Sequence, residues 1–274
     1  MFILLVYTIS SLGMKPPFLS FRTFAPMSEA LPHDHINPFH DSDKTKKEQV
    51  ADMFNKIAGK YDKMNRVLSA RTDVGWRKKA ILQLKKDKPR HILDVATGTG
   101  DMAIMACKLL NPEQVTGIDI SEGMLELGRK KIEKEELGDK IHLQLGDSET
   151  INYRENTFDA VMVAFGVRNF ENLENGLAEM LRVLKPGGRL IVLEFSKPKR
   201  PGFKSLYNLY MNIVAPGVGK FFTKNKDAYQ YLNESVQAFP ERESFIRIME
   251  LSGYNNTYFK PLSLGICCIY CGSK

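Results

Sequence analysis

The most informative part of the sequence for the type of fold is the stretch His91-Ile-Leu-Asp-Val-Ala-Thr-Gly-Thr-Gly-Asp101, which is followed one helix later by Gly117-Ile-Asp119. It reads as an apolar strand that opens into a glycine loop, followed by a second strand that ends in a carboxylate. Gly98 and Gly100 let the backbone approach a ligand closely, because a Cβ there would occupy the space that the ligand needs. Asp119 can accept hydrogen bonds from both hydroxyls of a ribose. These residues predict a nucleoside-binding site.

Strands and helices alternate on both sides of this loop. We expect strands at 91–96, 115–119, 141–145, 158–164 and 189–195, helices from 101, at 122–135, 171–184 and 241–252, and two last strands near 256–260 and 264–271. Lys185-Pro-Gly-Gly188 is predicted to be a turn between a helix and the next strand. This order predicts an α/β, Rossmann-like fold. Its mostly parallel seven-stranded sheet carries helices on both faces and binds ligands at the carboxyl ends of its strands.

One domain is expected to fill residues 45–274. Apolar positions at helical spacing predict an N-terminal helical lid at 45–88, and the basic, aromatic stretch 197–232 is predicted to be a partly helical insertion. Residues 1–44 form an extension that we expect to be disordered. Within it, the first 26 residues share no periodicity with the domain and end before Met27, so we expect them to reflect an upstream start codon.

Two groups of residues are of the types that bind metal ions, but each also has a simpler explanation. Cys268 and Cys271 form a C-x-x-C pair, but no second pair completes a zinc site, and alternation along a strand would turn them to opposite faces. We interpret them as packing residues. His33, His35 and His40 are expected to lie in a solvated tail. The sequence therefore predicts no bound metal.

The composition suggests an anionic partner. The net charge is +7 over 274 residues, with 43% hydrophobic and 26% charged residues, and the pI is about 9.1. Such a charge is compatible with nucleic acid or with a membrane surface. Basic residues cluster only in 197–226 and no nucleic-acid motif is present, so we expect no nucleic-acid partner, although a basic nucleic-acid-binding module stays as an alternative.

The kind of nucleoside depends on one carboxylate. Gly98-Thr-Gly100-Asp-Met-Ala103 also satisfies the dinucleotide pattern G-x-G-x-x-A, with Asp119 about where a nicotinamide dinucleotide site needs it. Asp101, however, places a negative charge at the helix N-terminus where a pyrophosphate would lie. A cofactor without phosphate is favoured, and the positive S-adenosylmethionine fits. Asp147, in Gly146-Asp147-Ser148 after the third strand, can face its adenine amine or simply cap the loop.

Beyond the glycine loop, the sequence resembles the quinone-biosynthesis C-methyltransferases of the UbiE, MenG and COQ5 type from Lys46 to its C-terminus. Four stretches carry the resemblance: Val50-Ala-Asp-Met-Phe-Asn-Lys-Ile-Ala-Gly-Lys-Tyr-Asp-Lys-Met-Asn65, Phe165-Gly-Val-Arg-Asn169, Leu193-Glu-Phe-Ser-Lys-Pro198, and Tyr229-Gln-Tyr-Leu-Asn-Glu-Ser-Val-Gln-Ala-Phe-Pro240. The resemblance implies a class I S-adenosylmethionine-dependent methyltransferase fold. It also implies transfer of a methyl group to a ring carbon of a polyprenylated quinol.

The substrate that the resemblance implies first is demethylmenaquinol, which becomes menaquinol. A ubiquinone precursor, 2-polyprenyl-6-methoxy-1,4-benzoquinol, is the alternative, and an NAD-dependent oxidoreductase is a more distant one. By position, the residues that match the family's cofactor contacts are Thr99, Asp119, Asp147 and Ser148. Ala164 departs from the family, because some members carry a serine there.

Arg168 and Asn169 follow the fourth strand and are the predicted catalytic residues. They could orient the quinol or stabilise the phenolate that develops when the ring carbon attacks the methyl group. The competing interpretation makes Arg168 a surface cation and Asn169 a helix cap. Tyr61 and Asp62 lie in the predicted lid, where Asp62 could instead cap its own helix.

A lipid quinol does not readily leave the bilayer, so the enzyme is expected to visit a membrane. Basic and aromatic residues alternate through Lys197–Lys226, which suits an anionic lipid surface. The same pattern would arise if the apolar positions packed on the sheet and the lysines faced water. We therefore expect a cytoplasmic enzyme, peripheral to the inner face of the membrane, and leave open whether it forms a homo-oligomer.

Overall fold

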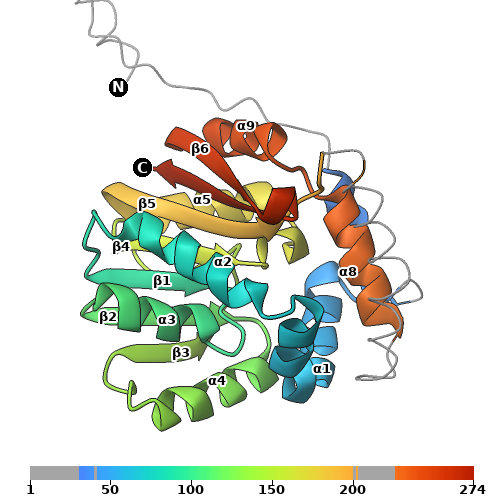
Figure 1. Ribbon diagram of the computed structural model, residues 1–274, viewed down its shortest axis with the longest axis horizontal. Helices are drawn as coiled ribbons and strands as arrows, with labels where there is room; N and C mark the ends of the chain where they lie inside the picture. Colours follow the sequence, from blue (N-terminus) through green and yellow to red (C-terminus); the bar gives the residue numbers. More distant parts are fainter. Residues whose placement is uncertain (1–30, 40–41, 200–201, 203–225) are drawn as a thin grey trace, which may run out of the picture. The chain divides into compact units, whose positions relative to one another are not determined.

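A mixed seven-stranded sheet forms the centre of the protein in a computed structural model that describes residues 31–39, 42–199, 202 and 226–274 (Figure 1). The strands are β1 (His91–Val95), β2 (Gln114–Asp119), β3 (Ile141–Leu145), β4 (Phe158–Ala164), β5 (Leu184–Phe195), β6 (Asn255–Leu262) and β7 (Cys267–Ser273). Their order is β3-β2-β1-β4-β5-β7-β6. The first five strands pair in parallel, and β7 is antiparallel to both β5 and β6. The predicted α/β class and strand count are confirmed.

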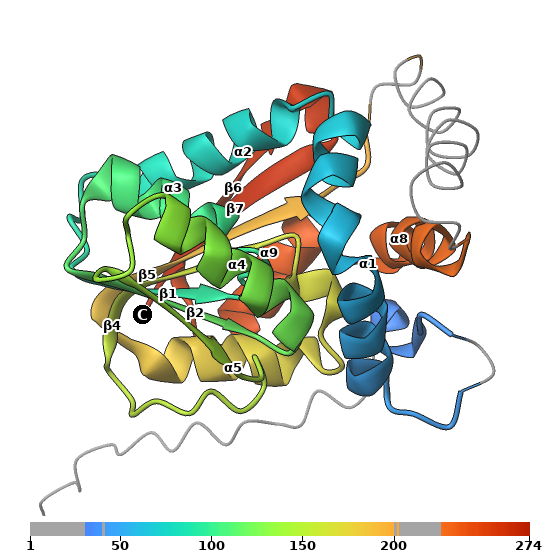
Figure 2. The same cartoon turned by 90° about the horizontal axis from the view of Figure 1, so that it is seen from below.

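Helices cover both faces of the sheet. Those given by the structure are α1 (Lys46–Leu68), α2 (Thr72–Ile81), α3 (Asp101–Leu110), α4 (Glu122–Lys134), α5 (Leu173–Val183), α8 (Lys226–Ala238) and α9 (Glu243–Leu251). The helices α2, α3 and α4 lie on one face and α5 and α9 on the other (Figure 2). By contrast, α1 and α8 lie beyond the end of the sheet at which the parallel strands finish (Figure 1).

Alternation along the strands divides the core into two apolar clusters, one on each face of the sheet. In β1, for example, Leu93 packs in one cluster and Ile92 in the other. The same alternation separates Cys268 from Cys271, which are buried, unbonded to each other and in different clusters. The interpretation of these two cysteines as packing residues is confirmed.

Three sequence expectations differ from the structure. The Lys185–Gly188 stretch is part of β5 rather than a turn before it, with a register shift opposite the start of β4. Part of the predicted disordered extension is ordered, because Pro32–His35 forms a 3-10 helix. His33 is fully buried and not solvated; its backbone oxygen accepts a hydrogen bond from Lys46 Nζ at 2.7 Å, and its ring contacts Phe239. The stretch 1–26 lies outside the described residues.

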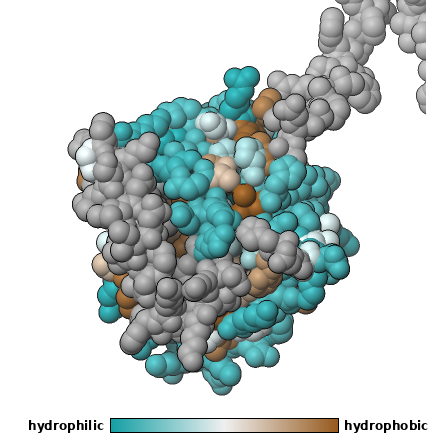
Figure 3. Space-filling model, turned by 90° about the vertical axis from the view of Figure 1, so that its right-hand side faces the viewer, coloured by the Kyte–Doolittle hydropathy of each residue, from teal (hydrophilic) through white to brown (hydrophobic). Residues whose placement is uncertain are grey.

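The surface at the carboxyl ends of the parallel strands is mainly hydrophilic where the structure describes it, with small hydrophobic areas between polar groups (Figure 3). Among the described residues, no helix combines the length and the hydropathy that crossing a membrane requires. Most of the predicted insertion 197–232 falls in 200–201 and 203–225, outside the described residues. Its last part forms the beginning of α8.

Close packing between α4 and the glycine loop should be sensitive to a single methyl group. A Cβ at Gly128 would meet Leu143 Cδ1 at 2.5 Å and the carbonyl carbon of Thr99 at 3.2 Å. We expect Gly128→Ala to lower the free energy of unfolding by about 1–3 kcal/mol. Gly59 is the matched control in α1, since a Cβ there meets nothing within 4 Å. Gly59→Ala should raise stability by about 0.5–1 kcal/mol. Urea unfolding measures both, and equal shifts would contradict the tight contact.

Candidate active site

A pocket opens at the carboxyl ends of β1, β2, β3 and β4, beneath α1. Its walls come from the loops after these strands and from one side of α1. The lining residues are Lys47, Val50, Phe54, Tyr61, Ala96, Gly98, Asp119, Ile120, Met124, Gly146, Asp147, Ser148, Glu149, Ala164, Phe165, Gly166, Asn169, Phe170 and Glu171. This is where ligands bind in open parallel sheets. The pocket lies where the sequence predicts the site.

Asp119, at the end of β2, is the best-positioned predicted residue. Its carboxylate accepts hydrogen bonds from the backbone N–H of Gly98 at 2.8 Å and of Ser121 at 2.9 Å, and only 9% of the residue is exposed. Burial raises the pKa of the Asp119 carboxyl to about 6, although backbone N–H donors oppose the shift. The carboxylate lines the pocket and retains lone pairs for ribose hydroxyls.

The glycine loop uses its glycines for backbone conformation. Gly98 has φ +58° and Gly100 φ +76°, a region that disfavours side chains. Gly98 lines the pocket, whereas Gly100 does not; a Cβ on Gly100 would meet Leu143 and Ile132 in the core at 3.6 and 3.7 Å. The expectation that a Cβ at Gly100 would displace the ligand is therefore wrong. A glycine is needed at this position because the backbone makes a left-handed turn.

Asp147 and Ser148 line the pocket on the β3 side. One carboxylate oxygen of Asp147 accepts from the backbone N–H of Glu149 at 2.9 Å, as a loop cap would. The other accepts from Lys47 Nζ of α1 at 2.5 Å, and Lys47 also lies 3.6 Å from a carboxylate oxygen of Glu149. The capping role is therefore observed, and the adenine contact of Asp147 stays a prediction.

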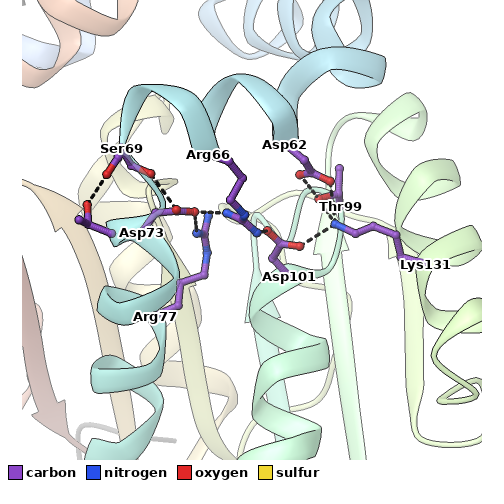
Figure 4. Close-up of polar contacts among 9 residues, drawn as sticks. Asp62, Arg66, Ser69, Asp73, Arg77, Thr99, Asp101 and Lys131 are labelled. Atoms are coloured by element: carbon purple, nitrogen blue, oxygen red, sulfur yellow. Dashed lines mark hydrogen bonds and ion pairs between the residues drawn. The ribbon is translucent and has the colours of Figure 1, made fainter.

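Thr99 connects the glycine loop to α1 and is 3% exposed. Its hydroxyl donates to Asp62 Oδ1 at 2.7 Å and accepts from Lys131 Nζ of α4 at 2.9 Å (Figure 4). Lys131 also binds the second oxygen of Asp62 at 2.8 Å. Asp62 is thus bonded to another element and does not act as a local cap. Thr99 is absent from the pocket lining, and its cofactor contact stays a prediction.

Asp101 begins α3 with both of its carboxylate oxygens in ion pairs. Lys131 Nζ lies 2.6 Å from one, and Arg66 Nη2 of α1 lies 2.5 Å from the other (Figure 4). Burial would raise the pKa of this carboxyl, but Lys131, Arg77 and Arg66 hold it below its usual value. Arg66 further binds Asp73 of α2. The charge at this helix N-terminus, which we expected to repel a pyrophosphate, is therefore neutralised by the protein itself.

The two predicted catalytic residues lie on the 3-10 helix Val167–Asn169 but face different surroundings. Asn169 lines the pocket, and its Oδ1 is buried without a hydrogen-bond partner among the described residues. Arg168 is 5% exposed and is not one of the pocket-lining residues. Its Nη1 donates to Glu194 Oε1 at 3.0 Å, so it is a buried cation and not a surface one. No observation tests the catalytic assignment of either residue.

Sequence reasoning missed several site residues. Lys47 and Phe165 line the pocket, and Glu194 is the fully buried partner of Arg168. Glu194 could have been recognised from the sequence, because an acid inside the apolar run of a central strand needs a partner. Lys47 could not, because its role depends on how α1 folds back over the sheet. Within the described ranges, no three His, Cys, Asp or Glu side chains gather as a metal site.

Comparison with known proteins shows to which family the chain belongs. The sequence pattern of the ubiE/COQ5 methyltransferase family matches residues 42–274. The chain belongs to that family. It is a methyltransferase, and S-adenosylmethionine is its methyl donor. The stretch 42–274 spans β1 to β7 and every pocket-lining residue, so the match covers the whole described site.

Among similar proteins, a demethylmenaquinone methyltransferase of Bacteroides fragilis is 46% identical over 243 residues, covering 89% of this chain and 99% of that protein. A ubiquinone/menaquinone biosynthesis C-methyltransferase of Geotalea daltonii is 43% identical, covering 84% and 97%. The crystal structure of a SAM-dependent methyltransferase of Thermotoga maritima, a possible histamine N-methyltransferase, has a TM-score of 0.56 at 20% identity, covering 82% and 99%. This structural likeness shows that the methyltransferase fold is shared.

The raised pKa of Asp119 predicts pH-dependent cofactor binding. Below pH about 6 the buried carboxyl is protonated in the free protein and can no longer accept two ribose hydroxyls as an anion. Affinity for S-adenosylmethionine should therefore decrease as the pH is lowered through about 6, and the decrease should approach about tenfold per pH unit at lower pH. Calorimetry at several pH values measures this. Constant affinity from pH 7.5 to 5 would contradict it.

Asp119→Asn is the control, because it removes the titrating group. Asp94, whose pKa burial raises to about 7, would still titrate in that variant. At pH 7.5 we expect Asp119→Asn to lose about 2–4 kcal/mol of cofactor binding, or roughly 30- to 1000-fold. Folding stability should change by less than about 1 kcal/mol, because removing an acid of raised pKa relieves the cost of its ionisation while the amide NH₂ can no longer accept one of the two backbone N–H groups.

The contacts of Lys131 predict that it holds α1 against the glycine loop. Lys131→Met leaves Asp62 and Asp101 without their shared cation. We expect amide exchange in α1 to become about fivefold faster, for a loss near 1 kcal/mol. The matched control is Lys108→Met, which breaks an exposed ion pair with Glu135; neither of these residues belongs to α1. Hydrogen exchange that changes equally in both variants would show that Lys131 has no special role.

Proposed function

We propose that this methyltransferase transfers a methyl group from S-adenosylmethionine to a ring carbon of demethylmenaquinol, giving menaquinol. The observation that carries the proposal is the 46% identity to a demethylmenaquinone methyltransferase over nearly its full length. The pocket agrees in character, because apolar and aromatic residues, among them Val50, Phe54 and Phe165, form part of its lining. The relative from Geotalea daltonii keeps the ubiquinone precursor as the second candidate substrate.

The cofactor is proposed to lie along the loops after β1, β2 and β3. Asp119 would bind the ribose hydroxyls, and Asp147 with Ser148 would face the adenine. The turn at Gly98 and Gly100 would bring backbone close to the cofactor, with Thr99 holding that turn to α1. Pocket lining by Gly98, Asp119, Asp147 and Ser148 supports this arrangement.

The reaction needs orientation more than covalent help from the protein. A ring carbon made electron-rich by loss of a phenolic proton attacks the methyl carbon, and the bond between that carbon and sulfur breaks. The ring then regains its aromatic form by losing the proton on the attacked carbon. Asn169 Oδ1, buried and without a partner in the described part of the chain, is suited to accept the hydrogen of a quinol hydroxyl.

The enzyme is further proposed to work at the inner face of a membrane, because its substrate is a lipid. The net charge of +7 supports an anionic surface. Contacts are known for the side chains of two lysines of the membrane segment: Lys197 Nζ donates to the backbone oxygen of Gln237 at 2.8 Å, and Lys199 lies 3.4 Å from Glu243. The rest of Lys197–Lys226, apart from 198, 202 and 226, lies outside the described residues.

Mass spectrometry of cellular quinones tests the substrate. Cells that lack the protein should accumulate demethylmenaquinone and lose menaquinone, and expression of the chain should restore it. Accumulation of 2-polyprenyl-6-methoxy-1,4-benzoquinone instead would select the ubiquinone branch. In vitro, labelled methyl should pass from S-adenosylmethionine to demethylmenaquinol, while menaquinol, which is already methylated, serves as the control. An unchanged quinone profile together with no transfer in vitro would refute the proposal.

A further inference from the structure

Phe165 lies in the pocket wall with an unfavourable backbone. It follows β4 directly, is 7% exposed and has φ +59°. An aromatic residue rarely adopts this left-handed conformation, and it persists only where neighbouring groups hold it in place. Such residues concentrate at functional sites, so the groups that hold Phe165 identify what this position is for.

Three hydrogen bonds fix the Phe165 backbone. Its N–H donates to the carbonyl of Leu193 in β5 at 2.7 Å. Its carbonyl accepts from Arg168 Nη1 at 2.5 Å and from Asn169 Nδ2 at 3.4 Å. Arg168 Nη1 is in turn bound to Glu194, which is completely buried. The buried ion pair therefore ends on the backbone of a pocket-lining residue.

The Phe165 ring is also held on the side that faces the protein. Its centroid lies 4.6 Å from that of Phe195 and 6.4 Å from that of Trp76. Arg77 Cζ lies 5.3 Å from the Phe165 ring centroid, and Arg168 Cζ lies 5.5 Å from that of Phe195. Two rings, tilted by 34° to each other, thus lie close to two guanidinium groups, an arrangement that fixes an aromatic surface.

The chemistry of Arg168 points in the same direction. A guanidinium stays protonated in proteins and offers no lone pair, so it cannot take a proton from a quinol. Arg168 is 5% exposed, does not line the pocket, and already donates to Glu194 and Phe165. Its Nε is buried, so it does not open into the pocket.

We propose that Phe165 is the wall that positions the quinol ring, and that Arg168, locked by Glu194, is a positioning residue that acts through Phe165. This rests on the proposed function, since the ligand must be an aromatic ring that has to be held in line with the methyl group. A ring tilted by loss of this wall would still bind, but its carbon would miss the methyl carbon.

A double-mutant cycle separates a positioning role from a direct one. Arg168→Gln should lower kcat/KM for demethylmenaquinol by about tenfold or more, and Phe165→Gly, which removes the ring and the backbone conflict together, by a similar factor. In the Phe165→Gly background, Arg168→Gln should cost less than about twofold further. Phe170→Ala is the matched control, because Phe170 also lines the pocket but has φ −60°. In that background the full effect of Arg168→Gln should return.

Folding and cofactor binding are measured in every variant. Arg168→Gln leaves Glu194 buried without its cation, so the cycle is repeated with the paired variant Arg168→Gln/Glu194→Gln in place of Arg168→Gln, which removes both buried charges together. Affinity for S-adenosylmethionine should stay within about threefold of wild type, and the pH profile of kcat should keep its shape in Arg168→Gln.

Losses that multiply in the double variant, or a pH profile that loses one limb in Arg168→Gln, would overturn the proposal and assign Arg168 a direct contact with substrate. These outcomes require an active wild type, so they leave the proposed function standing. A wild-type enzyme that binds S-adenosylmethionine but methylates no quinol refutes the proposed function, and the role of Phe165 with it.

Discussion

The carboxylates of Asp94, Asp119 and Glu194 are buried near the carboxyl ends of β1, β2 and β5, and the loops of the site fold around them. Burial raises the pKa of all three, because an anion in the interior loses its hydration. Each therefore needs donors nearby. Asp94 receives the Thr97 hydroxyl at 2.6 Å, Asp119 receives two backbone N–H groups, and Glu194 receives Arg168. The donors that meet Asp119 and Glu194 include the backbone N–H of Gly98 and the Arg168 guanidinium, so these acids help to fix the conformation of the loops beneath the pocket.

The cover of the pocket is held by a different kind of contact. In α1, Lys47, Asn55 and Asp62 each bond to a different loop, after β3, β2 and β1 respectively. These pairs are partly exposed, and such contacts contribute about 0–1 kcal/mol each. The loops beneath the pocket are therefore held by contacts of buried acids, whereas α1, which covers the pocket, is held by several weak, partly exposed contacts. We therefore expect α1 to separate from the pocket at a lower free-energy cost than the sheet unfolds, as the predicted lid requires.

Periodicity was enough to predict most of the fold, because strands buried on both faces and amphipathic helices leave strong patterns. The bounds of β3 and β4 agree at both ends with the expected 141–145 and 158–164. The site was predictable where a residue ends a strand, as Asp119 does. It was not where the role depends on a distant element: the partners of Asp62 are 37 and 69 positions away, and the burial of His33 depends on α8 and its surroundings. Arg168 was located, but its burial against Glu194 was not foreseen.

The choice between S-adenosylmethionine and a dinucleotide now has a structural basis different from the one the sequence suggested. Repulsion by Asp101 cannot decide it, because Lys131 and Arg66 neutralise that carboxylate. The same ion pairs, however, occupy the N-terminus of α3, where a dinucleotide places its pyrophosphate. The pocket lining includes Gly98 but neither Gly100 nor Asp101. The pocket therefore extends from Gly98 towards β2, β3 and β4, and at its β2 side Asp119 lines it as a buried acid. A pyrophosphate at the start of α3 would have to break the contacts of α1, and one in the pocket would lie beside Asp119, whereas S-adenosylmethionine carries no phosphate and meets neither obstacle.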